Sequence, residues 1–433
     1  MGHMWKRVGR YVRWLVRGIA LGFAVGAAMW LLTTTVIWVS GIRRGHSALY
    51  LAIPLGALVT AWLYQTLGPY LRSGTAQVID IINHGLVSLV SPTSQRNDTA
   101  TAENISGKMA PLLYFSTIFS HLVGASTGKE GAGVQIGASM GNYIGRIEDG
   151  LLPKRFEDHD PRNAGIWMIS GAGAAFGALF NAPVAGTLFG LQFSSPQVNR
   201  SEAFIPSLTA SFTACFVSKN LLHIATLSPA ASVSVGLTPL LVAKLFVLAI
   251  CMGLFSKLFI GLAGSYRKWL SSRFPSIWMR TITSSLLLLA FSLMFARIAG
   301  NWSLNGLSSD LIGAKVAWYV PLGKMILTVL SIGSGFVGGE VIPIMVLGST
   351  AASLFANVVG IPVNAITCFG ALGMLSAATK LPLACFMLGL EIFGFANPAA
   401  LFFVCIISYS VSGMKGIYEK QGDVFHFTKN WEV

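Results

Sequence analysis

Long apolar segments recur along the whole chain, and they constrain its fold more than any other feature. Several are long enough to cross a hydrocarbon layer of about 30 Å, which takes about 20 helical residues. Others are shorter, or are interrupted by glycine and proline. The apolar segments cover approximately residues 18–39, 48–67, 110–126, 164–193, 204–226, 236–264, 281–299, 316–336, 343–359, 364–378 and 381–411.

The composition indicates that these segments face lipid. Only 11% of the 433 residues are charged and 54% are hydrophobic, whereas a soluble domain carries about 25% charged residues. Backbone groups left unpaired in lipid are costly, so interrupted helices at membrane depth survive only inside protein or beside a watery cavity. Short, interrupted spans in both halves are typical of a transporter with a site near the midplane. The sequence therefore predicts an all-α integral membrane protein of about a dozen or more helices, with little or no sheet.

The positive charge of the chain lies beside the apolar segments rather than on one face. Its net charge is +14, but this distribution argues against a nucleic-acid partner. Positive charge flanking membrane spans predicts a multi-pass protein with a cytoplasmic N-terminus. The basic residues that carry this argument are Lys6, Arg7, Arg10, Arg13, Arg17, Arg43, Arg44, Lys154, Arg155, Arg162, Lys415 and Lys420.

The remaining composition predicts no signal peptide, disulfide framework or metal site. The apolar run near the N-terminus is too long for a cleavable signal, and Gly2-His3-Met4 resembles a cloning remnant. The five cysteines sit singly in apolar segments, so we expect small buried hydrophobes. The histidines are scattered, without the spacing of a metal or catalytic cluster. We therefore expect no cofactor, no metal and no enzymatic activity.

The chain repeats itself in two halves. Residues 127–137 and 337–348 each contain a glycine-rich turn with a glutamate, followed by an apolar helix that meets another glycine. Further along, residues 181–192 pair with residues 380–391, and Pro, Ala, Gly and Leu fall in register. An internal repeat of this size predicts two related bundles that enclose a site between them.

The two glycine turns are candidates for an anion site. A helix that begins inside the membrane leaves its first N–H groups unpaired and carries about half a positive charge at that end. Glycine allows a sharp turn and a close approach of an ion to the amides. A simpler alternative is that the glycines only permit tight helix packing. Glu130 and Glu340 favour the functional alternative, because an ionisable residue inside a span is costly.

These motifs resemble those of the CLC family of chloride channels and anion/proton antiporters, over nearly the whole chain. Residues 128–137 are similar to the G(K/R)EGPxVQ signature, with alanine where proline is usual, and residues 333–343 to GxxxGGxFxP. Residues 73–78 are a weaker likeness of the GSGIPE loop. Residues 180–186 and 416–418 match the helix that closes the first half and the last helix. The resemblance implies a bundle of tilted and broken helices in two inverted-topology repeats.

The resemblance implies a role for individual residues. Glu130 resembles the external gating glutamate, whose carboxylate can occupy an anion position and leave it when protonated. The alternative for Glu130 is a carboxylate held at a helix start by the dipole. Tyr418 resembles a hydroxyl ligand of the ion, and its alternative is an interfacial aromatic anchor. The implied anion-binding set is Ser73, Gly131, Ala132, Gly133, Glu340, Val341, Ile342 and Tyr418.

Two departures from the family pattern bear on the transported ion. The usual antiporter carries an inner glutamate after the Asn-Ala-Pro helix, where this chain has Gln192-Phe193. The Gly-Gly-Glu-Val motif that contains Glu340 resembles the motif of the fluoride-exporting branch, whose glutamate serves the inner proton step. The alternative is that Glu340 only caps a helix. Ser73 and Ile342 stand where that branch has methionine and threonine, and serine is typical of chloride- and nitrate-selective members. We expect fluoride/proton antiport first, and chloride/proton antiport or a chloride channel second.

The repeat and the resemblance together suggest an organisation of the chain. We expect a cytoplasmic N-terminus over residues 1–17, membrane repeats over 18–226 and 227–415, and a last short helix with the C-terminal tail over 416–433. The resemblance also implies a homodimer in a prokaryotic inner membrane, with small anions (fluoride, chloride), protons and lipid as partners. The alternative from another class is a non-transporting membrane protein or a membrane enzyme.

Overall fold

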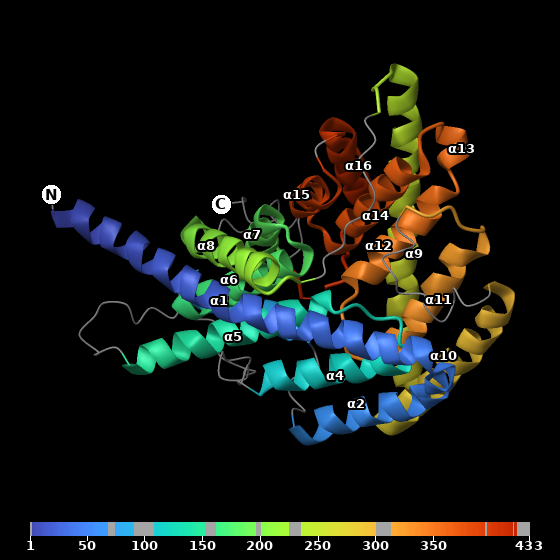
Figure 1. Cartoon of the computed structure of the whole chain (residues 1–433), viewed down its shortest axis with the longest axis horizontal. Helices are drawn as coiled ribbons and strands as arrows, with labels where there is room; N and C mark the ends of the chain where they lie inside the picture. The colour runs from blue at the N-terminus through green and yellow to red at the C-terminus, as the bar shows by residue number, and fades with distance from the viewer. Residues whose placement is uncertain are drawn as a thin grey trace, which may run out of the picture.

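The computed structural model describes residues 2–67, 74–90, 108–151, 162–195, 201–224, 235–299, 313–394, 396–418 and 420–421. Within these residues nearly every segment is helical and no strand occurs. The prediction of an all-α bundle of many broken helices is confirmed. The first half of the chain forms one body of helices and the second half another, side by side (Figure 1).

The helices follow one another along the chain in two halves. Those of the first half are α1 (Gly2–Gly45), α2 (Ile53–Leu67), α3 (Thr75–Val90), α4 (Met109–Val123), α5 (Glu130–Leu151), α6 (Arg162–Phe180), α7 (Pro183–Gln192) and α8 (Phe204–Cys215). Three shorter turns also occur here: η1 (Ser47–Ala52), η4 (Ser201–Ala203) and the π-helical η5 (Phe216–Leu221). Those of the second half are α9 (Pro239–Arg273), α10 (Ile277–Ala299), α11 (Tyr319–Gly333), α12 (Val341–Ser353), α13 (Ala356–Val359), α14 (Val363–Thr379), α15 (Pro382–Phe393) and α16 (Pro398–Val411).

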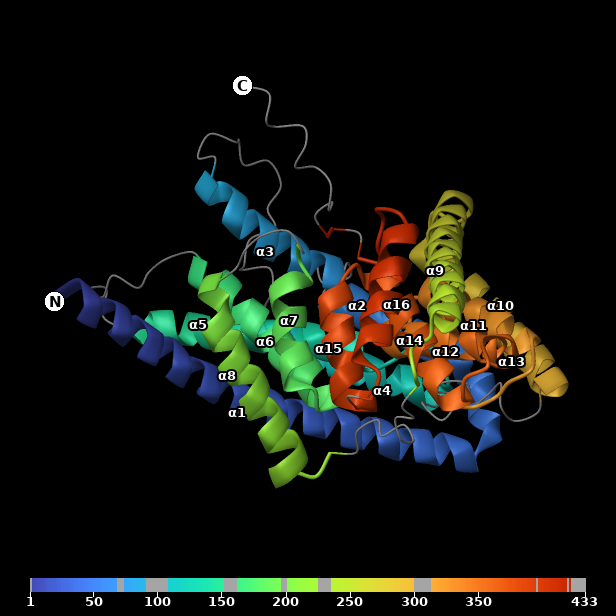
Figure 2. The same cartoon turned by 90° about the horizontal axis from the view of Figure 1, so that it is seen from above.

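Five helical spans are long and apolar enough to cross a membrane, and the shorter apolar helices lie among them. The span Asn163–Phe180 is 83% buried in its most apolar window, whereas Ile277–Phe295 is only 28% buried. The first therefore belongs to the interior of the bundle, and the second presents apolar side chains to the outside, where lipid would cover them. The long helices α1 and α9 run in clearly different directions along the outside (Figure 2).

The predicted internal repeat is visible in how matching helices pack. A Cβ atom on Gly137 of α5 would clash with the carbonyl oxygen of Gly171 in α6, and a Cβ on Gly171 would clash with that of Gly137. Gly348 of α12 and Gly370 of α14 make the same reciprocal contact. In both halves the helix that follows the glycine turn therefore packs backbone to backbone against the next long helix, and no larger residue fits there.

A second correspondence lies at the starts of α7 and α15. Asn181 and Lys380, which the sequence repeat pairs, both adopt left-handed backbone conformations, with φ of 54° and 62°. In each case a proline two residues later occupies the first turn of the next helix. Non-glycine residues seldom adopt a positive φ, so two in equivalent places indicate that both halves reverse the chain in the same way.

Of the expected last helix and tail, only residues 416–418 and 420–421 are described. The described residues after Val411 form turns and bends rather than a helix, and residues 419 and 422–433 lie outside the described part. Gly416 and Tyr418 nevertheless return to the bundle, because the Ile417 N–H donates to the carbonyl oxygen of Ala378 at 2.7 Å.

Candidate anion site

The two glycine turns meet in the middle of the molecule. The N–H of Gly128 donates to the carbonyl oxygen of Gly339 at 2.6 Å, and the N–H of Gly339 donates back to Gly128. These two residues form an isolated antiparallel bridge. A Cβ atom on Gly131 would lie 2.7 Å from the Gly339 Cα, so the close approach of the two turns requires glycine.

The first turns of α5 and α12 are built in the same way. The Gly133 N–H donates to the Lys129 carbonyl oxygen at 2.9 Å. The Ile344 N–H donates to the Glu340 carbonyl oxygen at 3.0 Å. Lys129 and Glu340 are thus equivalent positions at the two helix starts. In this register Glu130 is the first residue of its helix, whereas Glu340 precedes its helix, so the two glutamates are not equivalent.

The residue at which each helix begins determines which backbone N–H groups are left unpaired at its amino end. The first N–H groups of a helix have no acceptor within the helix, and they belong here to Gly131 and Ala132 in α5 and to Val341 and Ile342 in α12. The Gly133 N–H is already bonded inside α5, so the expectation that it lines the outer site is not supported. Two positive helix ends converge, which is the arrangement that attracts an anion without a lysine or arginine contact.

Glu130 lies between these two helix ends. Its side chain is 3% exposed, and its carboxyl group interacts with the charge of Lys129. The carboxyl group accepts from the backbone N–H groups of Glu130 itself and Lys129, at the start of α5, and from that of Ile342, in the first turn of α12. Its Oε2 atom is buried and has no hydrogen-bond partner among the described residues. A carboxylate supplied by the first half therefore occupies the amino end of a helix in the second half.

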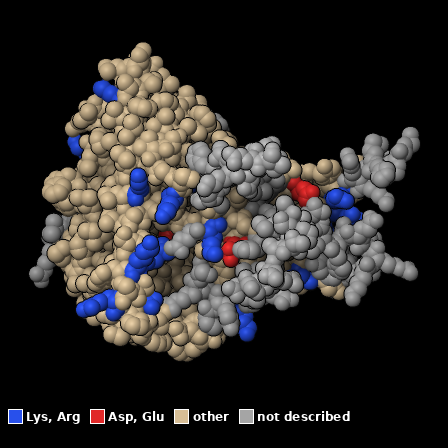
Figure 3. All heavy atoms as spheres, turned by 180° about the vertical axis from the view of Figure 1, so that it is seen from behind, with Lys and Arg blue, Asp and Glu red and all other residues tan. Residues whose placement is uncertain are grey.

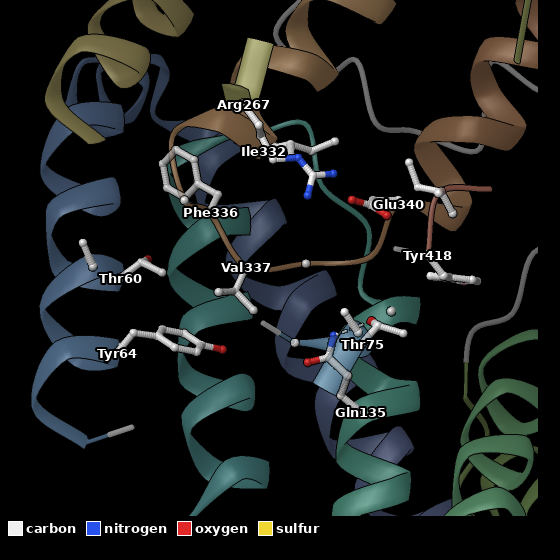
Figure 4. A pocket seen from close by; sticks show the side chains of 17 residues that line it. Thr60, Tyr64, Thr75, Gln135, Arg267, Ile332, Phe336, Val337, Glu340 and Tyr418 are labelled. Carbon is white, nitrogen blue, oxygen red and sulfur yellow. Dashed lines mark hydrogen bonds between the residues drawn. The ribbon is translucent and has the colours of Figure 1, made fainter. Parts of the chain in front are cut away.

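Glu340 and Tyr418 border a cavity of about 370 Å³ beside this junction. Glu340 immediately precedes α12 but makes no side-chain capping hydrogen bond, which argues against the helix-cap alternative. Tyr418 lines the cavity as well, rather than the outer surface of the bundle. Figure 4 shows the side chain of Glu340 near that of Tyr418 at the cavity wall.

Three residues that were not assigned to the site from the sequence also line the cavity: Thr75, Gln135 and Arg267. The Gln135 Nε2 donates to the Thr75 Oγ1 at 2.9 Å, which ties α3 to α5 (Figure 4). Gln135 could have been assigned to the site from the sequence, because it belongs to the first glycine motif. Arg267 could have been assigned as well, because it is a charged residue in the long apolar helix α9.

Two other predicted features have different outcomes. Ser73 lies outside the described residues, although its neighbour Gly74 lines the cavity with a φ of 57°. Of the pair Gln192-Phe193, expected in place of an inner acid, Phe193 is fully buried in a stack of rings with Phe189 and Phe176. The ring centroids of Phe189 and Phe193 are 5.4 Å apart. Phe193 therefore belongs to the apolar core, whereas Gln192 is half-buried.

One face of the molecule is rich in positive charge. Figure 3 shows Lys and Arg side chains gathered around a recess in which an acidic side chain is visible. Clefts lined by one sign of charge raise the local concentration of counter-ions, so this face favours the approach of anions.

Comparisons with known proteins agree with this geometry. Residues 55–413 match the family model described as voltage gated chloride channel. The chain is 25% identical to a chloride/fluoride channel protein of Pseudomonas syringae pv. tomato, over 94% of this chain and 86% of that protein.

Two solved structures share the fold. The crystal structure of a CLC-type fluoride/proton antiporter superposes with a TM-score of 0.82 at 27% identity, covering 95% of this chain and 98% of that one. A slow cyanobacterial Cl⁻/H⁺ antiporter superposes with a TM-score of 0.72 at 18% identity, covering 94% and 96%. The family match spans most of the chain and both glycine turns, and the protein belongs to the voltage-gated chloride channel family, the CLC family of anion transporters and channels.

Proposed function

We propose that this protein exchanges a small anion for protons across the membrane, and that fluoride is the anion it exports. The observation that carries the proposal is the position of Glu130, whose buried carboxyl group lies at the amino end of α12. An anion attracted to the same helix end competes with that carboxylate for the same backbone N–H groups.

This competition couples the two ions. When the Glu130 carboxyl group is charged, it holds the place of an anion at Ile342. Protonation removes its charge, so the helix end attracts it less and an anion replaces it. Anion entry therefore favours proton uptake by Glu130, and proton release favours the return of the carboxylate.

Glu340 is the residue that we assign to the inner proton step. It lines the cavity together with Tyr418, and Gln192-Phe193 stand in place of the usual inner acid. A proton that enters from the cavity side reaches Glu340 before it reaches Glu130, because Glu340 borders the cavity and Glu130 is 3% exposed. Tyr418 and the first-turn amides of Val341 and Ile342 would hold the anion beside it.

Fluoride is favoured by the Gly338-Gly339-Glu340-Val341 sequence and by the likeness to a fluoride/proton antiporter at 27% identity. Fluoride is small and strongly hydrated, and charge-assisted donors at short range are the contacts that replace its water. Chloride/proton antiport or a chloride channel is the second candidate, because Ser73 and Ile342 depart from the fluoride-exporting pattern.

We further propose a homodimer in the inner membrane of a prokaryote, with a cytoplasmic N-terminus. The orientation is supported by the basic residues of the first segment, since positive charge is retained on the cytoplasmic side.

The test is a flux measurement on purified protein in liposomes. Fluoride and chloride efflux are recorded with and without a pH gradient, for the wild type, Glu130→Gln, Glu340→Gln and the control Glu202→Gln, whose side chain is exposed. We expect fluoride to drive uphill proton movement in the wild type and the control, and anion flux without proton movement in Glu130→Gln.

Each assignment can fail separately. If neither anion drives protons, the protein is a channel and the antiport proposal is wrong. If chloride moves as readily as fluoride, the selectivity proposal is wrong. If Glu340→Gln keeps full proton coupling, Glu340 is not the inner proton residue.

A further inference from the structure

Two basic side chains, Arg43 and Lys324, are buried apart from the lining of the cavity. Arg43 lies in the last turn of α1 and is 5% exposed, and Lys324 lies in α11 and is 3% exposed. The Nε and Nη1 atoms of Arg43 and the Nζ atom of Lys324 are buried without a hydrogen-bond partner among the described residues. Five donors of a guanidinium and three of an ammonium normally find acceptors when they are buried.

The surroundings do not neutralise this charge. The charged group that interacts with Lys324 is Arg43 itself. The guanidinium group of Arg43 lies over the Tyr50 ring, with its Cζ atom 5.7 Å from the ring centroid. Leu327 and Phe295 belong to the same apolar cluster as Tyr50. A buried charge without a partner is strongly unfavourable, so an anion that contacts both groups would offset the cost of burying them.

The loop that leads to Glu130 contacts Arg43 at its start and α11, the helix of Lys324, further along. Arg43 packs close to Gly124, at the start of this loop: a Cβ atom added to Gly124 would lie 3.3 Å from the Arg43 Cδ. Further along, Ser126 Oγ is 3.0 Å from Thr328 Oγ1, and that hydroxyl donates to the Lys324 carbonyl oxygen at 2.8 Å. The loop is therefore attached to α11 one turn from Lys324.

One further cation, Lys129, lies next to Glu130 and interacts with it. His121, in the last turn of α4, interacts electrostatically with both Arg43 and Lys129. The hydroxyl of Thr127, between them, is buried without a hydrogen-bond partner among the described residues. These residues precede the amino end of α5, whereas the cavity borders Gly131 and Gln135 within that helix.

We propose that Arg43 and Lys324 form a second anion-binding site, where a small halide is held before it reaches the position of the Glu130 carboxylate. Two cationic donor groups with unused hydrogen atoms offer short, charge-assisted contacts. Apolar neighbours keep the site dry, which strengthens those contacts. The binding itself does not depend on the proposed antiport, although its role as a waiting position does.

The first test measures halide binding and its effect on thermal stability in detergent. Melting temperatures in sodium fluoride and sodium chloride are compared with those in sodium gluconate, for the wild type, Arg43→Met and Lys324→Met. Arg44→Met and Lys315→Met are matched controls, because both side chains are exposed and one of them is the neighbour of Arg43.

We expect the halide-dependent rise in melting temperature to shrink in Arg43→Met and Lys324→Met and to persist in both controls. The halide affinity of this site should fall about tenfold or more, as expected for a lost bond to a charged donor. Lys324→Arg should restore the rise. An unchanged halide effect in both buried-site variants overturns the proposal.

A second test needs no variant. Wild-type crystals grown in sodium bromide should show an anomalous peak within hydrogen-bonding distance of Arg43 Nε and Lys324 Nζ. Absence of that peak, at a bromide concentration that saturates the rise in melting temperature, overturns the site. Liposome flux without proton coupling would overturn the antiport proposal but leave this peak in place, so the two failures are distinguishable.

Discussion

Glu391 in the last turn of α15 caps the amino end of α7, where its Oε2 accepts from the backbone N–H of Ala185 at 2.8 Å. Its Oε1 accepts from the N–H of Val184 at 2.9 Å. A helix of the second half thus satisfies two of the first-turn amides of a helix in the first half. The two repeats are joined here by hydrogen bonds as well as by the glycine bridge.

Glu391→Gln should destabilise the protein by about 1–3 kcal/mol, because one carboxylate oxygen is replaced by an amide nitrogen that cannot accept from an N–H. The measurement is the melting temperature in detergent, with Glu202→Gln as the exposed control. An equal melting temperature in Glu391→Gln and the control would show that the cap contributes little.

Gly339→Ala should destabilise the junction of the two turns by about 1–3 kcal/mol and reduce anion flux. The added Cβ would lie 2.9 Å from the backbone nitrogen of Glu130 and would also clash with Gly131. Gly264→Ala is the control, since nothing lies within 4 Å of a Cβ at that position in α9. Normal flux through Gly339→Ala would mean that the close approach of the turns is dispensable.

Lys380→Met should weaken both stability and transport. The buried Lys380 ammonium donates to Ser412 Oγ and to the Gly413 carbonyl oxygen, each at 2.5 Å, and its Cγ lies against Gly416. Losing these bonds should cost about 1.5–3 kcal/mol and loosen the segment that carries Tyr418. Liposome flux and melting temperature are measured beside Lys415→Met, an exposed control; a flux loss in the control alone contradicts the prediction.

Tyr418→Phe should raise the anion concentration needed for half-maximal flux by about tenfold or more, because a hydroxyl donor to the ion is removed. The fold should be intact, since only one oxygen atom is lost from the wall of a cavity. Tyr143→Phe, at a position that is 53% exposed, is measured in parallel. An unchanged half-saturating concentration would favour the alternative in which Tyr418 only packs.

Much of the architecture was predictable because membrane proteins must satisfy every backbone group inside the segment. The apolar segments predicted the helices, and the paired motifs predicted that α5 and α12 begin at equivalent turns. Asn181 and Lys380, paired from the sequence alone, share a left-handed conformation. Each of these inferences depends on local residue order, which the sequence states directly.

The sequence alone determined that the chain is helical, that it repeats itself and that Glu130 and Glu340 sit at helix starts in apolar surroundings. Only the tertiary structure decided what those glutamates face. The two glutamates differ by one residue in their position at the helix start, and they contact different distant segments. Glu130 therefore faces Ile342, and Glu340 faces the cavity that Tyr418 lines. The same long-range packing buries Arg43 and Lys324, because burial depends on which segments meet in space rather than on their order in the chain.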